Sequence, residues 1–336
     1  MKKLFLIWLR YRRKMMKIIA KETLQEWSKL GHRNAMSASL EMLAAENADV
    51  CVLTADLTPT ARLTGFKEKY PDRFFDLGIA EQNLIDFTAG LAVEGLVPFA
   101  VGLAAIVPMR CAEQMRVALG YMKLNAKVIS IEAGVRFGPL GNTHYAMDDI
   151  AVVRAIPNFT IICPSDPHQI YKAIQASYEL DGPVYIRLTG GSGFPVLYPD
   201  DFEFTIGKAI EYKLGKEVAI ITTGSLLAEG IEAANILEQK GISTRVIDMH
   251  TIKPLDTEML DSVFSENTLI LTVEEHTPLG GLGGAVAEYK AQFANTPRQI
   301  MASLGDTFQE LGDYEYLIKK CGLKAADLAA LVELNR

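Results

Sequence analysis

The stretch FFDLGIAEQNL, residues 74–84, decides the fold more than any other part of the sequence. It predicts a buried strand over 74–77, a turn at Gly78 and a helix that begins near Glu81. The helix then continues over 83–96, which is almost wholly apolar, so we expect it to be buried, as a subunit interface would bury it. In an open parallel sheet, ligands collect at the carboxyl ends of the strands, which is where Glu81 falls.

The alternation of strand and helix continues on both sides of this stretch. Helical patterns over 21–30 and 34–45 come first, and later helical stretches separate the strands. The predicted strands are 50–54, 74–77, 97–101, 127–131, 160–163 and 183–188. This order is typical of a mainly parallel sheet that is covered by helices on both faces.

A Gly- and Pro-containing stretch, 190–199, ends the first series, and a second one starts near Gly215. Its predicted strands are 217–223, 243–248, 268–274 and 298–303, with helices over 226–240 and 283–293. The sequence therefore predicts an α/β fold of two doubly wound domains, the second smaller than the first. We place the domains at 21–195 and 213–336, with a linker over 196–212. Residues 1–20 form an N-terminal extension. We expect it to be disordered, or to result from a misassigned start codon.

The composition is that of a soluble globular protein, with 49% hydrophobic and 22% charged residues. A net charge of -7 gives no electrostatic reason to expect nucleic acid or an anionic membrane as partner. The apolar run at residues 4–9 is too short to span a membrane or to form an ordinary signal-peptide core. The four cysteines form no CxxC pair, and we expect reduced thiols in a cytoplasmic protein without a metal site.

Four segments in a fixed order resemble the transketolase family, whose glutamate motif is shared with the deoxyxylulose-phosphate synthases. They are the stretch around Glu81, ADLTP at 55–59, GNTH at 141–144 and VEEH at 273–276. The resemblance extends from Arg33 to about Leu331. It implies a pyrimidine-binding domain that activates thiamine diphosphate, followed by a transketolase C-terminal-like domain.

The resemblance also implies roles for individual residues. Glu81 would hydrogen-bond a ring nitrogen of the cofactor's aminopyrimidine, and we expect burial to keep this carboxyl group neutral enough to share a proton. His144 would contact substrate hydroxyls and move protons, for which imidazole is suited. Asp56 and Leu57 would border the cofactor, although Asp56 could instead cap the next helix. Glu274, Glu275 and His276 have the composition of a metal or acid–base cluster, but the resemblance implies a structural role.

Three further residues match positions that grip the distal phosphate of a sugar phosphate in the family. They are Arg33, Thr60 and Arg187, and guanidinium groups suit phosphate because they donate two parallel hydrogen bonds. The sequence departs from the family pattern elsewhere. Leu103, Ile106 and Met109 stand where aromatic rings usually sandwich the aminopyrimidine. Leu140 and Glu132 replace an aspartate and a histidine that face the substrate, and Arg136 could offset the acid. These departures leave open an unusual sugar phosphate, a sulfonated sugar or a different acyl transfer.

The family's full-length members carry an earlier domain that binds Mg²⁺ and the diphosphate through a Gly-Asp-Gly opening. The Gly-Asp pairs of this sequence, at 305–306 and 312–313, fall in the wrong domain. We therefore expect a separate N-terminal transketolase subunit to hold Mg²⁺, in a heterotetramer that transfers two-carbon units between sugar phosphates. The alternatives are half of a thiamine-dependent synthase or dehydrogenase that decarboxylates a 2-oxo acid, and a non-catalytic scaffold homologue.

Overall fold

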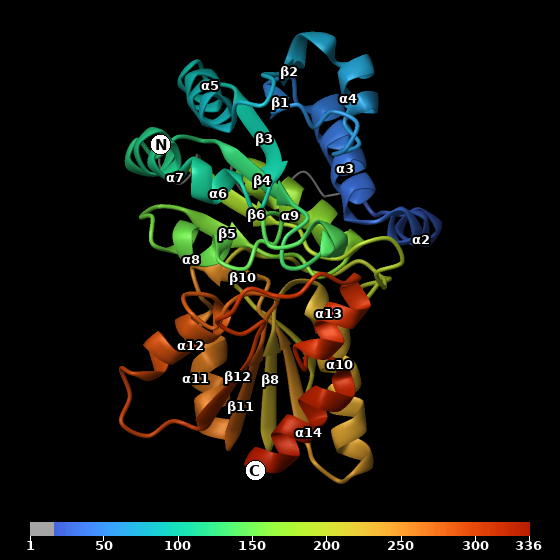
Figure 1. Cartoon of the computed structure of the whole chain (residues 1–336), viewed down its shortest axis with the longest axis vertical. Helices are drawn as coiled ribbons and strands as arrows, with labels where there is room; N and C mark the ends of the chain where they lie inside the picture. The colour runs from blue at the N-terminus through green and yellow to red at the C-terminus, as the bar shows by residue number, and fades with distance from the viewer. Residues whose placement is uncertain (1–16) are drawn as a thin grey trace, which may run out of the picture.

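The computed structural model describes residues 17–336, which form two α/β domains arranged end to end (Figure 1). Residues 1–16, most of the predicted extension, lie outside the described residues. The first sheet has seven strands in the order β10-β5-β6-β4-β3-β1-β2, and the second has five in the order β12-β11-β8-β9-β7. The prediction of two α/β domains with mainly parallel sheets is confirmed. No helix within residues 17–336 is both long and apolar enough to cross a membrane.

The first domain follows the predicted strand–helix order closely. Its strands are β1 (Val50–Thr54), β2 (Phe74–Asp76), β3 (Val97–Leu103), β4 (Lys127–Ile131), β5 (Thr160–Ile162) and β6 (Val184–Arg187). Its helices are α2 (Lys21–Leu30), α3 (His32–Glu46), α4 (Thr64–Lys69), α5 (Glu81–Val93), α6 (Val107–Arg110), α7 (Ala112–Gln114), α8 (Asp149–Arg154) and α9 (Pro167–Glu179). Three short turns of other helix types complete it: η1 (Pro71–Arg73), the π-helix η2 (Met115–Tyr121) and η3 (Gly138–Leu140).

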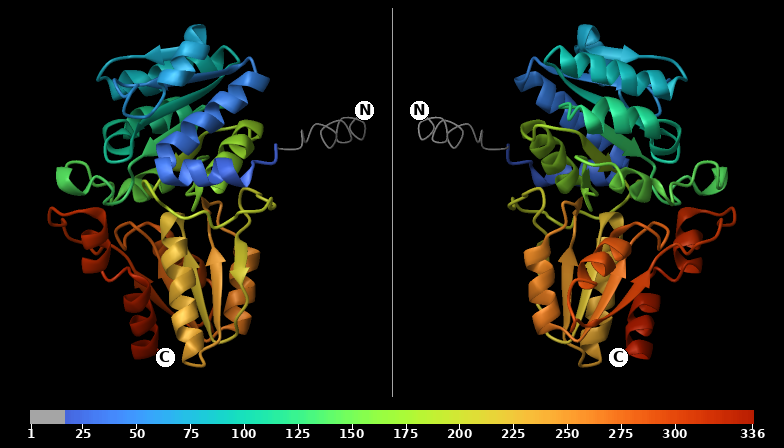
Figure 2. Two further views of the ribbon diagram at one scale, coloured as in Figure 1. Left: turned by 90° about the vertical axis from the view of Figure 1, so that its right-hand side faces the viewer. Right: turned by 90° about the vertical axis from the view of Figure 1, so that its left-hand side faces the viewer.

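The second domain contains β7 (Ile210–Lys213), β8 (Val218–Thr222), β9 (Thr244–Asp248), β11 (Leu269–Val273) and β12 (Arg298–Ala302). Its helices are η4 (Gly224–Leu226), α10 (Leu227–Gln239), α11 (Thr257–Glu266), α12 (Leu282–Lys290), α13 (Tyr314–Lys320) and α14 (Ala325–Asn335). Figure 2 shows helices on both faces of this sheet as well. The sequence patterns did not predict β7, α11, α13 or α14.

The parallel strands of the first sheet contribute side chains to two hydrophobic cores, one on each face, because successive side chains of a strand point to opposite faces. In β1, Val52 lies in the cluster with α2, α3 and α9, whereas Leu53 lies in the cluster with α5, η2 and α8. Both faces are thus apolar, which explains why the strands are continuous hydrophobic runs. The two faces leave the carboxyl edge of the sheet as the place where polar side chains gather.

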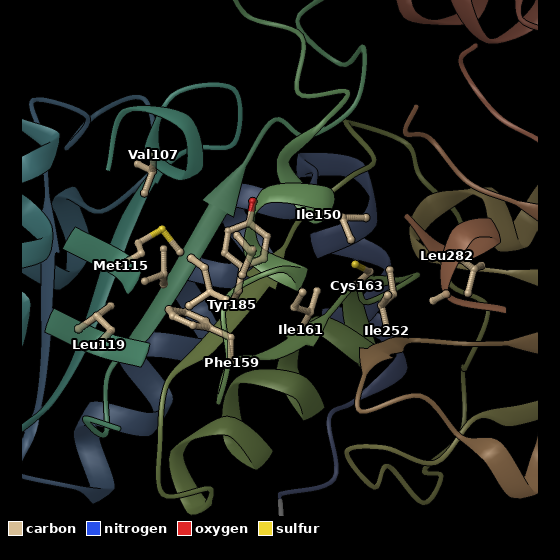
Figure 3. Close-up of a cluster of buried hydrophobic side chains, with 14 of the residues drawn as sticks. Val107, Met115, Leu119, Ile150, Phe159, Ile161, Cys163, Tyr185, Ile252 and Leu282 are labelled. Atoms are coloured by element: carbon tan, nitrogen blue, oxygen red, sulfur yellow. The ribbon is translucent and has the colours of Figure 1, made fainter. Parts of the chain in front are cut away.

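The two domains share one hydrophobic cluster at their junction. The strand β10 (Thr251–Lys253) leaves the second domain and pairs antiparallel with β5, and Cys163 N donates to His250 O at 2.7 Å. Figure 3 shows the cluster running from Leu119, beside the first sheet, to Ile252 and Leu282. The sequence did not predict β10, because three residues that pair with a distant strand carry no local periodicity.

Candidate active site

Glu81 is the first residue of α5, a short turn of chain beyond the end of β2. Gly78 makes the turn between them with a φ of 68°, a backbone conformation that glycine adopts without strain. The Glu81 side chain is only 10% exposed. The strand, glycine turn and helix predicted from residues 74–84 are therefore present, and they hold one carboxyl group at the carboxyl edge of the sheet.

The partner of Glu81 is a cation that the sequence did not signal. Arg110, the last residue of α6, donates from Nη1 to Glu81 Oε2 at 2.6 Å. The ion pair is a charge-assisted hydrogen bond, the stronger kind of hydrogen bond in proteins. The Arg110 side chain is 49% exposed, which leaves it free to move away when another group approaches Glu81.

The residues predicted to border the cofactor come from two segments at the same edge. Leu103 ends β3, and Ile106 and Met109 follow in the segment that leads to Arg110. Asp56 and Leu57 follow β1, which pairs with both β2 and β3. Met109 is 50% exposed, and Leu103 and Ile106 are half-buried. The segment that carries Leu103, Ile106 and Met109 thus ends at the partner of Glu81, so it lies at the same edge as that carboxyl group.

Asp76 holds the Asp56 segment in place, and sequence reasoning missed it. Its carboxylate accepts hydrogen bonds from Asp56 N at 2.8 Å and Thr58 Oγ1 at 2.6 Å, and from Gly78 N at 3.3 Å. Desolvation alone would raise the pKa of Asp76, but these hydrogen bonds hold the pKa below its ordinary value. Asp56 itself has a φ of 58°, an uncommon value for a residue with a side chain. The sequence signal that could have identified Asp76 is an acid at a strand end, shortly before the motif glutamate.

His144 lies in a loop that the second domain supports. Its Nδ1 is 2.9 Å from Thr143 Oγ1, and the ring meets the edge of Phe137 with centroids 5.6 Å apart. Asn142 Nδ2 donates to Gln309 O at 2.7 Å and Gln309 N donates back to Asn142 Oδ1 at 2.9 Å. In Figure 2 the green loop around residue 140 accordingly lies beside the red loop around residue 310. The second domain therefore fixes a loop of the first.

The structure brings together only two of the three residues predicted to grip a phosphate. Arg33 Nη1 donates to Thr60 O at 2.9 Å, and both side chains reach solvent. Arg187 is 1% exposed, and its Nε donates to Asp149 Oδ2 at 2.8 Å while Nη2 donates to the carbonyls of Ala146 and Glu275. Burial and these partners engage its guanidinium, so the structure does not bring Arg187 together with Arg33 and Thr60.

Glu132 forms a buried charge cluster with the start of α3. Its Oε1 lies 3.1 Å from Arg33 Nε and 3.3 Å from His32 Nε2. Desolvation by itself would raise the pKa of Glu132, but the hydrogen bond and charge of His32 and the charges of Arg33 and Arg136 hold the pKa below its ordinary value. Glu132 is thus an anion that neutralises Arg33 and not an acid standing free in the site.

Glu274, Glu275 and His276 are buried at the domain junction. Glu274 accepts from Leu282 N and Gly283 N at 2.7 Å each, which caps the start of α12. Glu275 accepts from Val135 N and Tyr314 Oη at 2.9 Å each. Burial raises the pKa of both carboxyl groups to about 7. Within residues 17–336 no group of three or more His, Cys, Asp and Glu side chains is arranged to hold a metal ion.

The comparisons with known proteins agree with this geometry. Residues 28–192 match the family described as transketolase, pyrimidine binding domain, and residues 207–328 match transketolase, C-terminal domain. The putative transketolase C-terminal section of Methanocaldococcus jannaschii is 35% identical over 89% of this chain and 94% of its own length. One of the subunits of the apulose-4-phosphate transketolase of Phocaeicola vulgatus is 37% identical over 76% of this chain and 82% of its own length.

A solved structure described as a split gene transketolase, inactive beta4 tetramer, is 37% identical and has a TM-score of 0.82. The match covers 90% of this chain and 96% of the chain in that structure. The fold, the carboxyl-edge glutamate and these relatives lead to one assignment. The chain belongs to the transketolase family, in which it is the C-terminal subunit of a thiamine-dependent, two-polypeptide transketolase.

Proposed function

We propose that Glu81 activates thiamine diphosphate for the transfer of a two-carbon ketol unit between sugar phosphates. The observation that carries this proposal is a mostly buried carboxyl group at the carboxyl edge of the sheet, paired with Arg110 at the end of the segment that contains Ile106 and Met109. When bound, the cofactor supplies the nucleophilic carbon and stabilises the carbanion that carbon–carbon cleavage leaves. The protein supplies orientation, proton positions and the exclusion of water.

Each residue of the site has a separate task in this proposal. Glu81 shares a proton with a ring nitrogen of the aminopyrimidine, which requires Arg110 to give up its contact with the carboxylate. Asp56 and Leu57 border the ring, in a position that Asp76 fixes. His144 donates or accepts a hydrogen bond at a substrate hydroxyl, since an imidazole ring carries nitrogens that can do either. Arg33 and Thr60 face the distal end of the sugar.

We further propose that a separate N-terminal subunit holds Mg²⁺ and the diphosphate, in a heterotetramer. Mg²⁺ requires fixed oxygen ligands together with the phosphates, and residues 17–336 offer no cluster of them. An apolar surface on α5 and η2 gives support for association. Its exposed side chains are Phe87 and Val93 on α5, Val117 and Tyr121 on η2, and Ile79 just before α5.

The experiment is to co-express the chain with the product of the neighbouring gene and to measure thiamine-dependent two-carbon transfer. Activity is expected only with both polypeptides, and activity from this chain alone would overturn the split arrangement. Glu81→Gln keeps the size of the side chain and should lower kcat by about 10²–10⁴-fold, the usual contribution of a positioned acid or base. Glu179→Gln is the matched control, because Glu179 is exposed at the end of α9, away from the carboxyl edge.

The burial of Arg187 favours one alternative more than the sequence did, because it removes one of the cations that argued for a sugar phosphate. In this alternative the complex decarboxylates a 2-oxo acid, and release of CO₂ from pyruvate in the same preparation would identify it. A complex that binds thiamine diphosphate but converts neither class of substrate would instead support a scaffold role.

A further inference from the structure

Arg136 is a half-buried arginine without a charged partner. It lies in the loop between β4 and η3, shortly before His144. Its guanidinium makes no hydrogen bond or ion pair with any side chain or backbone group of residues 17–336, although Arg33 and Arg187 are each paired with a carboxylate. A guanidinium has five N–H donors and requires acceptors for them. The donors of Arg136 are therefore available to a ligand.

Two neighbouring groups fix the guanidinium without using its donors. Its central carbon lies 4.9 Å from the centroid of the Tyr314 ring, a cation–π arrangement. On another side it occupies the space beside Gly191, where an added Cβ would lie 1.7 Å from Arg136 Nη2 and 1.8 Å from Cζ. Tyr314 is itself held by its hydrogen bond to Glu275 Oε2 at 2.9 Å. The second domain thus fixes a cation of the first, and contacts on the faces of a guanidinium leave its N–H edges exposed.

The carboxylates near Arg136 already have other partners. Glu132 lies against His32 and Arg33, and Glu275 accepts from Val135 N and Tyr314 Oη. Both acids are close enough for Arg136 to lower their pKa values, yet neither takes a hydrogen bond from it. An incoming anion therefore does not have to displace an ion pair, as it would at Arg33 or Arg187.

We infer that Arg136 binds the anionic end of the substrate, a tetrahedral oxyanion of the phosphate or sulfonate class. This inference rests on the proposed function and makes it more specific. It gives Arg136 the role that the family resemblance implied for Arg187. The preformed fork of donors is suited to two oxygens of one oxyanion. Selectivity for charged over neutral sugars then depends on one loop residue and on the glycine beside it.

The first test compares Arg136→Gln, Arg136→Lys and Gly191→Ala in the complex with the partner subunit. Gly191→Ala leaves the charge intact and displaces the guanidinium, and the φ of Gly191 lies outside the left-handed range that would strain an alanine. Arg298→Gln, at the start of β12 and far from this edge, is the control for net charge. The measured quantities are KM and kcat for erythrose 4-phosphate and for erythrose as acceptors.

Wild type should prefer the phosphorylated acceptor in kcat/KM. Arg136→Gln should reduce that preference roughly 10- to 150-fold, the usual range for hydrogen bonds to a charged group. The loss should fall mainly on KM, Gly191→Ala should reproduce part of it, and Arg136→Lys should retain part of the preference. An unchanged preference in Arg136→Gln, with Arg298→Gln also unchanged, would overturn the inference.

The second test works even when the complex converts no sugar, so that failure of the proposed function is distinguished from failure of this inference. Inorganic phosphate and sulfate are titrated separately into the full chain, and binding is followed by calorimetry. Saturable binding that Arg136→Gln and Gly191→Ala both weaken supports the site, and the ratio of the two affinities separates phosphate from sulfonate-type ligands. Binding that is equal in wild type and Arg136→Gln refutes it.

Discussion

Two of the carboxylate–arginine pairs at the carboxyl edge of the first sheet differ in what covers them. Asp149 and Arg187 are 0% and 1% exposed, and the Glu275 carbonyl of the second domain accepts a further hydrogen bond from Arg187. Arg110, the partner of Glu81, has a side chain that is 49% exposed. Burying a charge makes its pairing obligatory, whereas an exposed pair can be exchanged for another partner at little cost. The first pair is therefore suited to structure and the second to chemistry.

Removal of one charge from the buried pair should have the largest effect on stability. Asp149→Asn leaves Arg187 buried without a counter-charge, and it also weakens the hydrogen bond from Tyr185 Oη to Asp149 Oδ2. We expect the free energy of unfolding to fall by about 3–5 kcal/mol. Urea denaturation of the full chain measures this free energy. Glu81→Gln is the matched variant from the more exposed pair, Glu81 and Arg110, which we call the open pair. Equal losses in the two variants would contradict the comparison.

The buried acids of the junction should also make stability depend on pH. The pKa of Glu275 is raised by burial from 4.5 to about 7, so between these values the folded chain binds more protons than the unfolded chain. Its contribution is fully present below about pH 4.5 and is lost as the pH rises through about 7. Relative to Glu275→Gln, wild type should lose on the order of 2–3 kcal/mol between pH 5 and pH 8.

Urea midpoints of both proteins at the two pH values check this prediction. His250 and His276, whose pKa values burial lowers to about 4, contribute in the opposite direction, but they are present in both proteins. Parallel pH profiles for wild type and Glu275→Gln would show that Glu275 does not titrate in this range.

Loss of the carboxylate that positions the cofactor-binding segment should have an intermediate effect. Asp76→Ala removes the acceptor of three hydrogen bonds at the open edge. The free energy of unfolding should fall by about 1–2 kcal/mol, because the group is largely exposed. The affinity of the complex for thiamine diphosphate should fall too, as measured by titration of the cofactor. Asp72→Ala, an exposed acid in η1, is the control, and a normal cofactor affinity in Asp76→Ala would contradict the positioning role.

The smallest change is expected at the open pair itself. Arg110→Gln should alter the free energy of unfolding by only about 0.2–1 kcal/mol, the usual range for exposed pairs. Because Arg110 competes with the cofactor for Glu81, the affinity for thiamine diphosphate should rise, by up to about fivefold. Equilibrium dialysis of the complex with its partner measures it. A fall in affinity would mean that Arg110 contributes to cofactor binding and does not oppose it.

Local sequence determined the elements that carry the site. The run 74–84 predicted a strand, a glycine turn and a helix, and the structure has β2, Gly78 and α5 there. This succeeded because periodicity, a glycine at positive φ and an apolar helix are all encoded within a few neighbouring residues. For the same reason the six strands that were predicted for the first sheet lie within a few residues of their predicted bounds.

Pairings between distant residues could not be read in this way. Arg110 follows Glu81 by 29 positions, and no local pattern marks it as the partner of that carboxylate. Arg187 was placed among phosphate ligands because it matches a position of the family, but Asp149 and the second domain enclose it. Conversely, sequence reasoning assigned no role to Asp76 and only a minor one to Arg136, since their roles depend on which backbone groups and rings lie beside them.

The sequence by itself therefore determined the two α/β domains, the family resemblance and the position of Glu81 at a strand end. Tertiary structure alone decided which charged residues stay available at that edge. The physical reason is that propensity and periodicity act over a few residues, whereas burial and the pairing of charges depend on elements far apart in the chain. The second domain covers Arg187, supports the His144 loop and stacks Tyr314 on Arg136, and each of these effects arises only when the two sheets come together.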